Sequence, residues 1–198
     1  MKKLIIVRHG ETDFNRQRLM QGQLDTELNK TGHKQAHCAA LALKGEQFDA
    51  IWSSPLQRAK ATARYIHAHH DCPIEIEPLL TECSFGEFEG RPITELIQAE
   101  QQAERSGETF VARGAESKPE LVIRAQTLKQ KVLQSSAKTL ALVCHAGIAK
   151  PLIGQFLNHS IEEWFQLPQG NACINTLLID AEGRVLACQL NETAHCDS

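Results

Sequence analysis

The stretch that decides the fold is residues 4–12, LIIVRHGET. An apolar, β-branched run, Leu4–Val7, ends at once in Arg8, His9 and Gly10, which is typical of a buried strand followed by a turn. In an open α/β sheet, the carboxyl ends of the strands form the edge where ligands bind. The stretch therefore predicts a guanidinium and an imidazole at a binding edge, although a histidine at a strand end can also simply bind a backbone carbonyl.

A second apolar run ends in the same way. Residues 139–144, TLALVC, are followed by His145, Ala146 and Gly147. Because the carboxyl ends of parallel strands meet at one edge of a sheet, we expect the imidazoles of His9 and His145 to lie close together despite their separation in the sequence.

Helix and strand signals alternate over the rest of the chain. Strands are expected near residues 48–52, 74–76, 173–179 and 184–190, with a turn at Glu182-Gly183. Helices are expected at 31–44 (capped by Thr31 and ended by Gly45), from Ser54-Pro55 onward, at 92–105, from a capping box at Ser117–Glu120 onward, and at 148–157, while residues 14–30 read as a loop. This alternation predicts one α/β domain over residues 1–198, a three-layer fold with a mostly parallel sheet and helices on both faces. The irregular stretch 86–118 is expected to form a small cap near the active edge.

Composition limits the partners. The chain has 198 residues with a formal net charge of −3 and no long block of Lys and Arg, so we expect no nucleic-acid partner. No apolar stretch approaches membrane-spanning length, and the first apolar run is too short for a signal peptide. The seven cysteines form an odd set without a CxxC pair and are expected to be reduced thiols, mostly buried. These features predict a cytoplasmic protein.

Arg58 adds a second guanidinium to the predicted edge. Ser54 and Pro55 are typical of the N-cap and first residue of a helix, so Arg58 falls in the first turn, at the positive end of the helix dipole. Together with Arg8 and the two imidazoles, it predicts a dense cationic pocket in a chain that is acidic overall. Arginine forks match phosphate oxygens, so the expected ligand is a small dianion.

Glu82, in the stretch TECSFGEFEG (residues 81–90), is the candidate proton donor. A carboxyl half buried beside Phe85 and Phe88 would have a raised proton affinity because burial penalises its charged form. Nearby arginines would act in the opposite direction, and the sequence leaves this balance open.

Four stretches of the chain resemble the histidine phosphatase superfamily, in its phosphoglycerate-mutase-like branch. They are LIIVRHGET, SSPLQRAKATA (53–63), LLTECSFGEFEG (79–90) and LALVCHAG (140–147), and they occur in the order typical of that family. With LNKTGHKQA (28–36), they span most of the chain. The resemblance implies a phosphoglycerate-mutase-like fold and phosphoryl transfer without a metal or other cofactor.

The resemblance also implies a role for each matching residue. His9 would be the nucleophile that becomes phosphohistidine, and Glu82 the acid that protonates the leaving group and then the base that activates water. The residues implied to hold the phosphoryl group are Arg8, Arg58 and His145, and those implied to complete the phosphate pocket are Asn15, Gln21, Gly22, Ala146 and Gly147.

Three functions remain after this comparison. A phosphatase is favoured over a phosphoglycerate mutase, because mutases carry extra paired arginines after the acid loop, whereas Arg91, Arg105 and Arg113 are scattered. A non-catalytic phosphate-binding module is expected to lack a catalytic residue. All five are present here, namely Arg8, His9, Arg58, Glu82 and His145. A cysteine phosphatase is excluded, since the residues six positions after Cys144 and Cys83 are Lys150 and Glu89 rather than arginine.

The substrate expected from the resemblance is a small phosphomonoester. The short chain, with its HAG turn and compact cap, is similar to α-ribazole phosphatases of cobalamin nucleotide-loop assembly, and broad-specificity sugar-phosphate phosphatases look nearly the same. A homodimer is compatible with the sequence. His33 and His37, four residues apart, have a spacing that can bind metal, but without a carboxylate base between them a solvated helix face is favoured.

Overall fold

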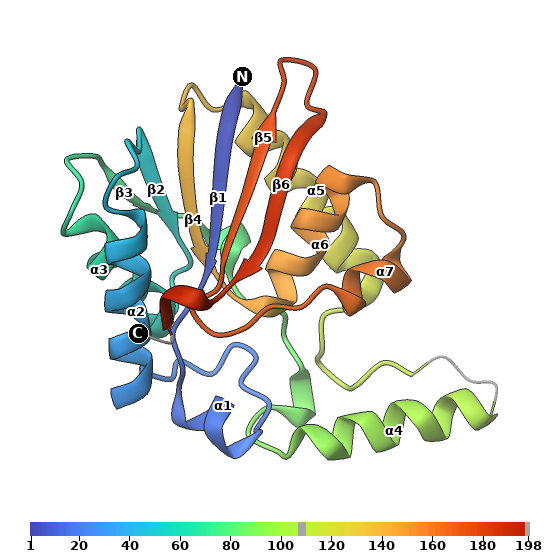
Figure 1. The fold of residues 1–198 in the computed structure, drawn as a ribbon. Coiled ribbons are helices and arrows are strands. Elements are labelled where there is room, and N and C mark those ends of the chain that lie inside the picture. Colours follow the sequence, from blue (N-terminus) through green and yellow to red (C-terminus); the bar gives the residue numbers. More distant parts are fainter. Residues whose placement is uncertain (107–109, 197–198) are drawn as a thin grey trace.

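A six-stranded sheet organises the molecule, in the order β3-β2-β4-β1-β5-β6 (Figure 1). The computed structural model describes residues 1–106 and 110–196. The strands are β1 (Lys2–Arg8), β2 (Ala50–Ser53), β3 (Ile74–Ile76), β4 (Thr139–Cys144), β5 (Ile174–Ile179) and β6 (Val185–Glu192). The first four strands pair in parallel, and β5 and β6 add antiparallel pairs. The predicted α/β fold with a mostly parallel sheet is confirmed.

The first strand lies at the centre of the sheet, between β4 and β5. Its side chains alternate between two core clusters, with Leu4 and Ile6 in one and Ile5 and Val7 in the other. All four are at most 1% exposed. A strand covered on both faces needs apolar residues at every position, which explains the uninterrupted apolar run.

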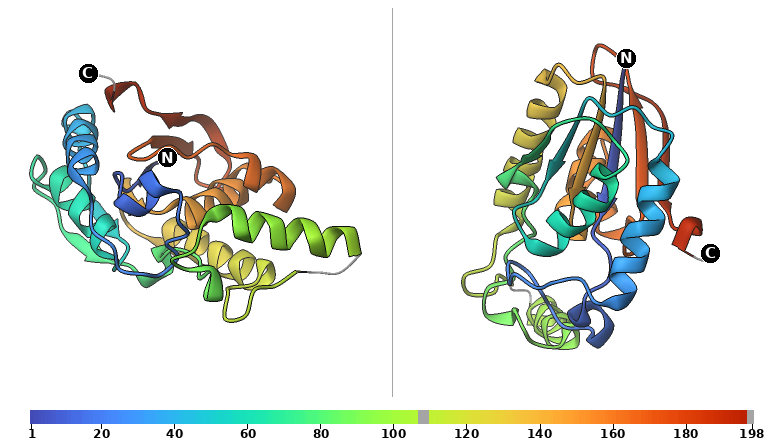
Figure 2. Two further views of the ribbon diagram at one scale, coloured as in Figure 1. Left: turned by 90° about the horizontal axis from the view of Figure 1, so that it is seen from below. Right: turned by 90° about the vertical axis from the view of Figure 1, so that its left-hand side faces the viewer.

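Helices cover both faces of the sheet (Figures 1 and 2). On the face of Ile5 and Val7 lie α2 (Lys30–Leu43) and α3 (Gln57–His67), and on the face of Leu4 and Ile6 lie α5 (Lys118–Gln134) and α6 (Ala146–Leu157). The remaining helical segments are α1 (Asp13–Gln17), α4 (Ile93–Ser106), α7 (Ile161–Gln166) and the short 3₁₀ turns η1 (Pro78–Leu80), η2 (Gly86–Phe88) and η3 (Ala194–Cys196). The predicted layers are therefore present.

Two predicted helix caps are wrong. The N-cap of α2 is Asn29, whose side-chain oxygen accepts a hydrogen bond from Gly32 N at 2.8 Å, and not Thr31. The helix predicted from Ser54-Pro55 begins only at Gln57. The Ser54 hydroxyl lies 2.7 Å from a nitrogen of the His145 ring, and this long-range contact competes with a regular helix cap.

Other boundaries also differ from the predictions. The stretch expected as a loop contains α1, and α7 was not predicted, although each begins with a capping box, Thr12 with Asn15 and Ser160 with Glu163. The α6 helix starts at Ala146 rather than near 148. The second strand is shifted from residues 48–52 to Ala50–Ser53.

The α4 helix lies beyond the carboxyl-end edge of the sheet, below the strands in Figure 1. It confirms the helix predicted at 92–105, and none of its residues is buried. Residues 107–109, which fall within the predicted cap segment, lie outside the described residues. No helix among the described residues is long and apolar enough to cross a membrane.

Candidate active site

Two imidazoles meet where β1 and β4 end. Arg8 pairs with Cys144 in the parallel register, and His9 N donates to Cys144 O at 3.0 Å, so the chain leaves both strands at the same level. The ring centroids of His9 and His145 are 5.0 Å apart. The structure thus brings together the two histidines that the strand-end patterns pointed to.

His9 is a neutral imidazole with a defined tautomer. Its Nδ1 lies 2.6 Å from Gly10 O, and because a carbonyl can only accept, Nδ1 carries the proton and Nε2 keeps its lone pair. The side chain is 2% exposed. Burial, followed by the positive charges of Arg58 and Arg8, holds the pKa of His9 well below its usual value of 6.5. Its Nε2 is therefore an unprotonated nitrogen at neutral pH.

His145 has the opposite tautomer. Arg58 Nε donates to His145 Nδ1 at 3.2 Å, so the proton of the neutral ring is on Nε2, which donates to Ser54 Oγ at 2.7 Å. Burial, with the neighbouring His9 and Arg58, holds the pKa of His145 well below 6.5. Both ring nitrogens are engaged, which fixes the plane of this imidazole against that of His9.

Arg58 is fully buried and tightly held. Its Nη1 donates to Leu24 O at 2.7 Å and its Nη2 to Gly22 O at 2.8 Å, so the loop after Gln21 wraps around the guanidinium. Burial lowers the pKa of Arg58 to about 10, and the group stays cationic at neutral pH. With Nε bound to His145, most of its five N–H groups are in use, and its effect on an anion is mainly its charge.

Arg8 has an N–H donor that is free to bind an anion. Its Nη1 donates to Gln169 O at 2.6 Å, while its buried Nε has no hydrogen-bond partner within the described part of the chain. Burial lowers the pKa of Arg8, and the nearby Glu82 carboxylate opposes that shift. A buried N–H without an acceptor costs free energy, so an anion that accepts from Arg8 would relieve that cost.

Glu82 is almost completely buried, at 8% exposed, rather than half buried as expected. Its Oε1 accepts from Cys83 N at 2.8 Å and its Oε2 from Gly147 N at 3.2 Å, so the carboxyl group sits on the first turn of α6, which begins at Ala146. A Cβ on Gly147 would lie 2.2 Å from Glu82 Oε1, so only glycine fits here. The Gly147 N–H donates to Glu82 and so helps to hold this carboxyl group in the pocket.

Asn15 and Gln21 join the site through Thr12. The Asn15 side-chain oxygen accepts from Thr12 N at 3.2 Å, and the Gln21 side-chain oxygen accepts from Thr12 Oγ1 at 2.8 Å and Thr26 Oγ1 at 2.6 Å. Both amides therefore use their oxygens for the protein. Their NH₂ groups remain as donors for a ligand.

The start of α3, a possible anion-binding position, is partly occupied by side chains of the protein itself. A helix start next to the active edge predicts unpaired N–H groups for an anion, but at α3 they are partly occupied. Gln57 N donates to Asp25 Oδ1 at 2.6 Å and Leu56 N to Ser54 Oγ at 3.3 Å. The N-terminus of α3 is therefore only partly open to an anion. The positive charge of this edge comes from Arg8 and Arg58.

Two residues that contact the site residues are not predicted to do so from the sequence. Ser54, which binds His145, was interpreted as a helix cap, and Gln169, whose carbonyl binds Arg8, follows an unpredicted helix. For Ser54 a signal existed, because it directly follows a buried strand at the same edge as His9. For a backbone carbonyl such as that of Gln169, the residue type carries no signal.

The histidine pair on α2 has a structural explanation. His33 and His37 both pack their rings against Tyr65 of α3, at 5.9 and 6.2 Å between centroids. Throughout the described residues, no group of three or more His, Cys, Asp or Glu side chains is arranged to hold a metal ion.

The chain belongs to the histidine phosphatase superfamily (branch 1), which it matches over residues 4–192. It is 38% identical over 147 residues to fructose-2,6-bisphosphatase TIGAR B of Danio rerio, a match that covers 70% of this chain and 57% of the relative. The chain thus spans little more than half the length of that protein.

Two solved structures cover nearly the whole chain. A mutant phosphoserine phosphatase from Entamoeba histolytica in complex with phosphoserine has a TM-score of 0.85 and 32% identity, and covers 98% of this chain and 99% of that one. An Escherichia coli protein assigned provisionally as an α-ribazole-5′-P phosphatase has a TM-score of 0.87 and 26% identity, with 98% of each chain covered. The family and these similar proteins confirm the predicted enzyme class, a phosphatase hydrolase.

Proposed function

We propose that this protein is a metal-independent phosphomonoester hydrolase that acts on a small phosphorylated metabolite through a phosphohistidine on His9. The observation that carries the proposal is the 2.6 Å hydrogen bond from His9 Nδ1 to Gly10 O, which leaves the Nε2 lone pair free beside two guanidinium groups. A neutral imidazole with cations around it is a suitable phosphoryl acceptor.

In the first step, His9 Nε2 attacks phosphorus and the P–O bond to the leaving group breaks. The charges of Arg8 and Arg58 stabilise the oxygens of the transferring group, and Arg8 offers its unpartnered Nε. Glu82, in its protonated form, gives its proton to the departing oxygen, and the alcohol leaves. His145 holds the Arg58 guanidinium against the phosphoryl group through its Nδ1.

In the second step, water attacks the phosphohistidine. Glu82, now a carboxylate, takes a proton from that water, the P–N bond breaks and inorganic phosphate leaves. Asn15 and Gln21, with their amide oxygens bound to Thr12, donate N–H groups to phosphate oxygens in both steps. Gly22, Ala146 and Gly147 shape the pocket, with Gly22 O and Gly147 N orienting Arg58 and Glu82.

The specific substrate that we propose is α-ribazole 5′-phosphate, with a role in cobalamin nucleotide-loop assembly. The similarity to the Escherichia coli protein supports this choice. The names of the other two relatives specify fructose 2,6-bisphosphate and phosphoserine. All three named substrates are phosphate esters of small polar metabolites.

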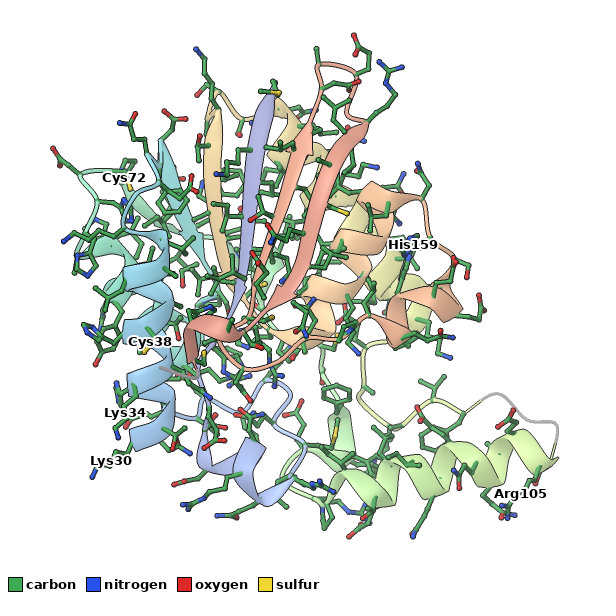
Figure 3. The ribbon with its side chains drawn as sticks, viewed as in Figure 1. Lys30, Lys34, Cys38, Cys72, Arg105 and His159 are labelled. Atoms are coloured by element: carbon green, nitrogen blue, oxygen red, sulfur yellow. The ribbon has the colours of Figure 1, made fainter. Side chains whose placement is uncertain are left out.

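A mutase is the alternative, and the arginines of the cap segment argue against it. Arg91 is paired with Glu95 and packs on Phe88, Arg113 is exposed, and Arg105 lies near the far end of α4 (Figure 3). They do not form a second anion pocket of the kind that a sugar-acid phosphate needs. A non-catalytic binding module would not need a His9 ring whose Nε2 is free to act as a nucleophile.

Further proposals concern the whole chain. We propose that residues 1–198 form one domain, with residues 86–118 as its cap, and that the protein acts in the cytoplasm without nucleic-acid or membrane partners. A homodimer remains a prediction that a measurement of molar mass in solution would test.

The test is phosphate release from a panel of phosphomonoesters in EDTA. The panel contains α-ribazole 5′-phosphate, phosphoserine, fructose 2,6-bisphosphate and 3-phosphoglycerate, with His9→Ala as the control. Release that EDTA does not inhibit and that the substitution abolishes would support the proposal, and the best ester would identify the substrate class. Equal, background release by both proteins would overturn it and favour a mutase assay.

A further inference from the structure

We propose that Asn171 is a positioning residue that acts together with Thr12 N to bias which end of the Asn15 amide faces the phosphate pocket. The inference rests on the proposed function, since it concerns the same pocket. Asn171 lies in the loop between α7 and β5, far from the motifs that mark the site. Its Nδ2 is 3.3 Å from His9 O and 3.1 Å from the side-chain oxygen of Asn15.

The orientations of both amides follow from backbone groups whose roles are fixed. His9 O can only accept, so the group of Asn171 that faces it must be the NH₂. Thr12 N can only donate, so the group of Asn15 that faces it must be the oxygen. One NH₂ of Asn171 therefore links the carbonyl of the nucleophile residue to the Asn15 oxygen, and no amide flip satisfies both ends.

This orientation matters because Asn15 has two chemically opposite ends. Because its oxygen is bound to Thr12 N and Asn171, its NH₂ is the end left for a ligand, and a donor suits a phosphate dianion. In the reversed orientation, the oxygen would face the phosphate and repel it. Asn171 biases this choice without itself needing to touch the ligand.

The loop that carries Asn171 is anchored on both sides. Gln169 O accepts from Arg8 Nη1 at 2.6 Å, Ala172 N donates to His9 O at 3.1 Å, and Gly170 N donates to Asn191 Oδ1 at 2.7 Å. The loop therefore holds Asn171 at a fixed place beside Arg8 and His9. A rigid support is what a positioning residue requires.

The decisive variant is Asn171→Asp, which keeps the shape but replaces the donor with an acceptor. The carboxylate repels the Asn15 oxygen and favours the flipped amide, which turns its oxygen toward the pocket. We expect Asn171→Ala, which only removes the bias, to weaken orthovanadate binding about fivefold to tenfold, and Asn171→Asp to weaken it by about a further tenfold. Gln166→Glu, on an exposed position at the end of α7, adds the same charge as a matched control and should bind like wild type.

A second pair of variants separates amide orientation from simple repulsion of an anion. Without the Asn15 side chain there is nothing to flip, so Asn15→Ala with Asn171→Asp should bind orthovanadate within about twofold of Asn15→Ala with Asn171→Ala. A tenfold difference that persists in the Asn15→Ala background would overturn the proposal, because it would mean direct charge repulsion. Equal binding by Asn171→Asp and wild type would also overturn it.

Calorimetric titration with orthovanadate and a thermal unfolding curve for each variant provide the readouts. Unchanged midpoints of unfolding are expected, and Asn171→Ala keeps the test available if Asn171→Asp does not fold. A wild-type protein that neither binds orthovanadate nor hydrolyses any ester would contradict the proposed function. A wild-type protein that does both, with unaffected Asn171 variants, would contradict only the role of Asn171.

Discussion

At the scale of single residues, two neutral imidazoles in contact are prepared for different tasks. His9 donates a hydrogen bond from Nδ1 to a carbonyl and keeps Nε2 free, whereas His145 accepts from Arg58 and donates to Ser54. Their neighbours, and not their own chemistry, make the difference. Both rings are difficult to protonate, since burial and the charges of Arg58 and Arg8 act against a further positive charge.

The depressed pKa values predict a loss of stability in mild acid. Well above pH 6.5, both rings are neutral in the folded and the unfolded chain and contribute nothing to the pH dependence. As the pH falls below 6.5, the unfolded chain binds protons that the folded pocket refuses, so the free energy of unfolding falls, by at most about 1.4 kcal/mol per pH unit for each histidine.

Urea unfolding between pH 5 and 8 measures this slope. His9→Asn combined with His145→Gln should give a clearly shallower pH dependence than wild type. The matched control for the loss of a histidine is His37→Gln, at an exposed position of α2 outside the pocket. Parallel curves for wild type and the double variant would show that the two rings titrate normally in the folded protein.

The role proposed for Glu82 predicts a dependence on the leaving group. Glu82→Gln keeps the shape but cannot donate a carboxylic proton, so hydrolysis of alkyl phosphates should fall by about 10²- to 10⁴-fold. Aryl phosphates with activated leaving groups need little protonation and should lose much less. Comparing kcat/KM for the two ester types checks this, and equal losses would remove Glu82 from the acid role.

Much of the site could be predicted because its main residues follow strong local patterns. His9 and His145 each end an apolar run, and parallel pairing then brings them together. Gln169 and Asn171 could not be found in this way, since their contacts join segments far apart in the sequence and no spacing marks them. The balance of charge around Glu82 also depends on distances that only the folded chain defines.

At the scale of elements, α6 and α7 meet at one glycine. A Cβ on Gly154 would lie 1.9 Å from Cδ1 of Trp164, whose indole N–H donates to His159 O at 2.9 Å. Glycine inside a helix normally costs about 1 kcal/mol relative to alanine. Here the close approach of the ring explains why glycine occupies the position.

We therefore expect Gly154→Ala to destabilise the protein by about 1–3 kcal/mol instead of stabilising it. The control is Gly45→Ala, because a Cβ there meets nothing within 4 Å and the change should be neutral or mildly stabilising. Urea unfolding followed by tryptophan fluorescence measures both. A more stable Gly154→Ala variant would mean that Trp164 moves aside freely.

The elements themselves were predicted best where burial and periodicity agree. The strand at 139–144 and the capping box at Ser117 appear as expected. Within α5, the buried residues are Leu121, Ala125, Leu128 and Val132, which recur at helical spacing. The short helix α1 has no buried residue and α7 has Trp164 alone, so capping boxes are their main local signal.

At the scale of the whole molecule, stability is unevenly distributed. The sheet lies between two core clusters, whereas α4 has no buried residue and its Ile93 and Ile97 are 37% and 43% exposed. Arg91, which pairs with Glu95 and packs on Phe88, ties the start of α4 to the preceding turn. The rest of α4 depends mainly on its own helical hydrogen bonds.

This contrast predicts a wide range of amide hydrogen exchange. Amides of α4 should exchange by local opening, at rates at least about 100-fold above those of β1 and β4, which open only with the whole fold. Exchange followed by mass spectrometry of peptides checks this. Saturating orthovanadate should slow exchange near Arg8 and His9, and equal protection of α4 and β1 would contradict the expected order.

The central position of β1 also has a consequence for the nascent chain. Its two neighbours, β4 and β5, are residues 139–144 and 174–179, so they leave the ribosome long after β1 does. Until then the apolar residues of β1 have no sheet to join, and His9 lacks both His145 and the loop that carries Asn171. Such late pairing is slow and prone to aggregation, which makes β1 a natural contact for a chaperone during translation. The proposed active site thus forms only after residues 139–179 have left the ribosome.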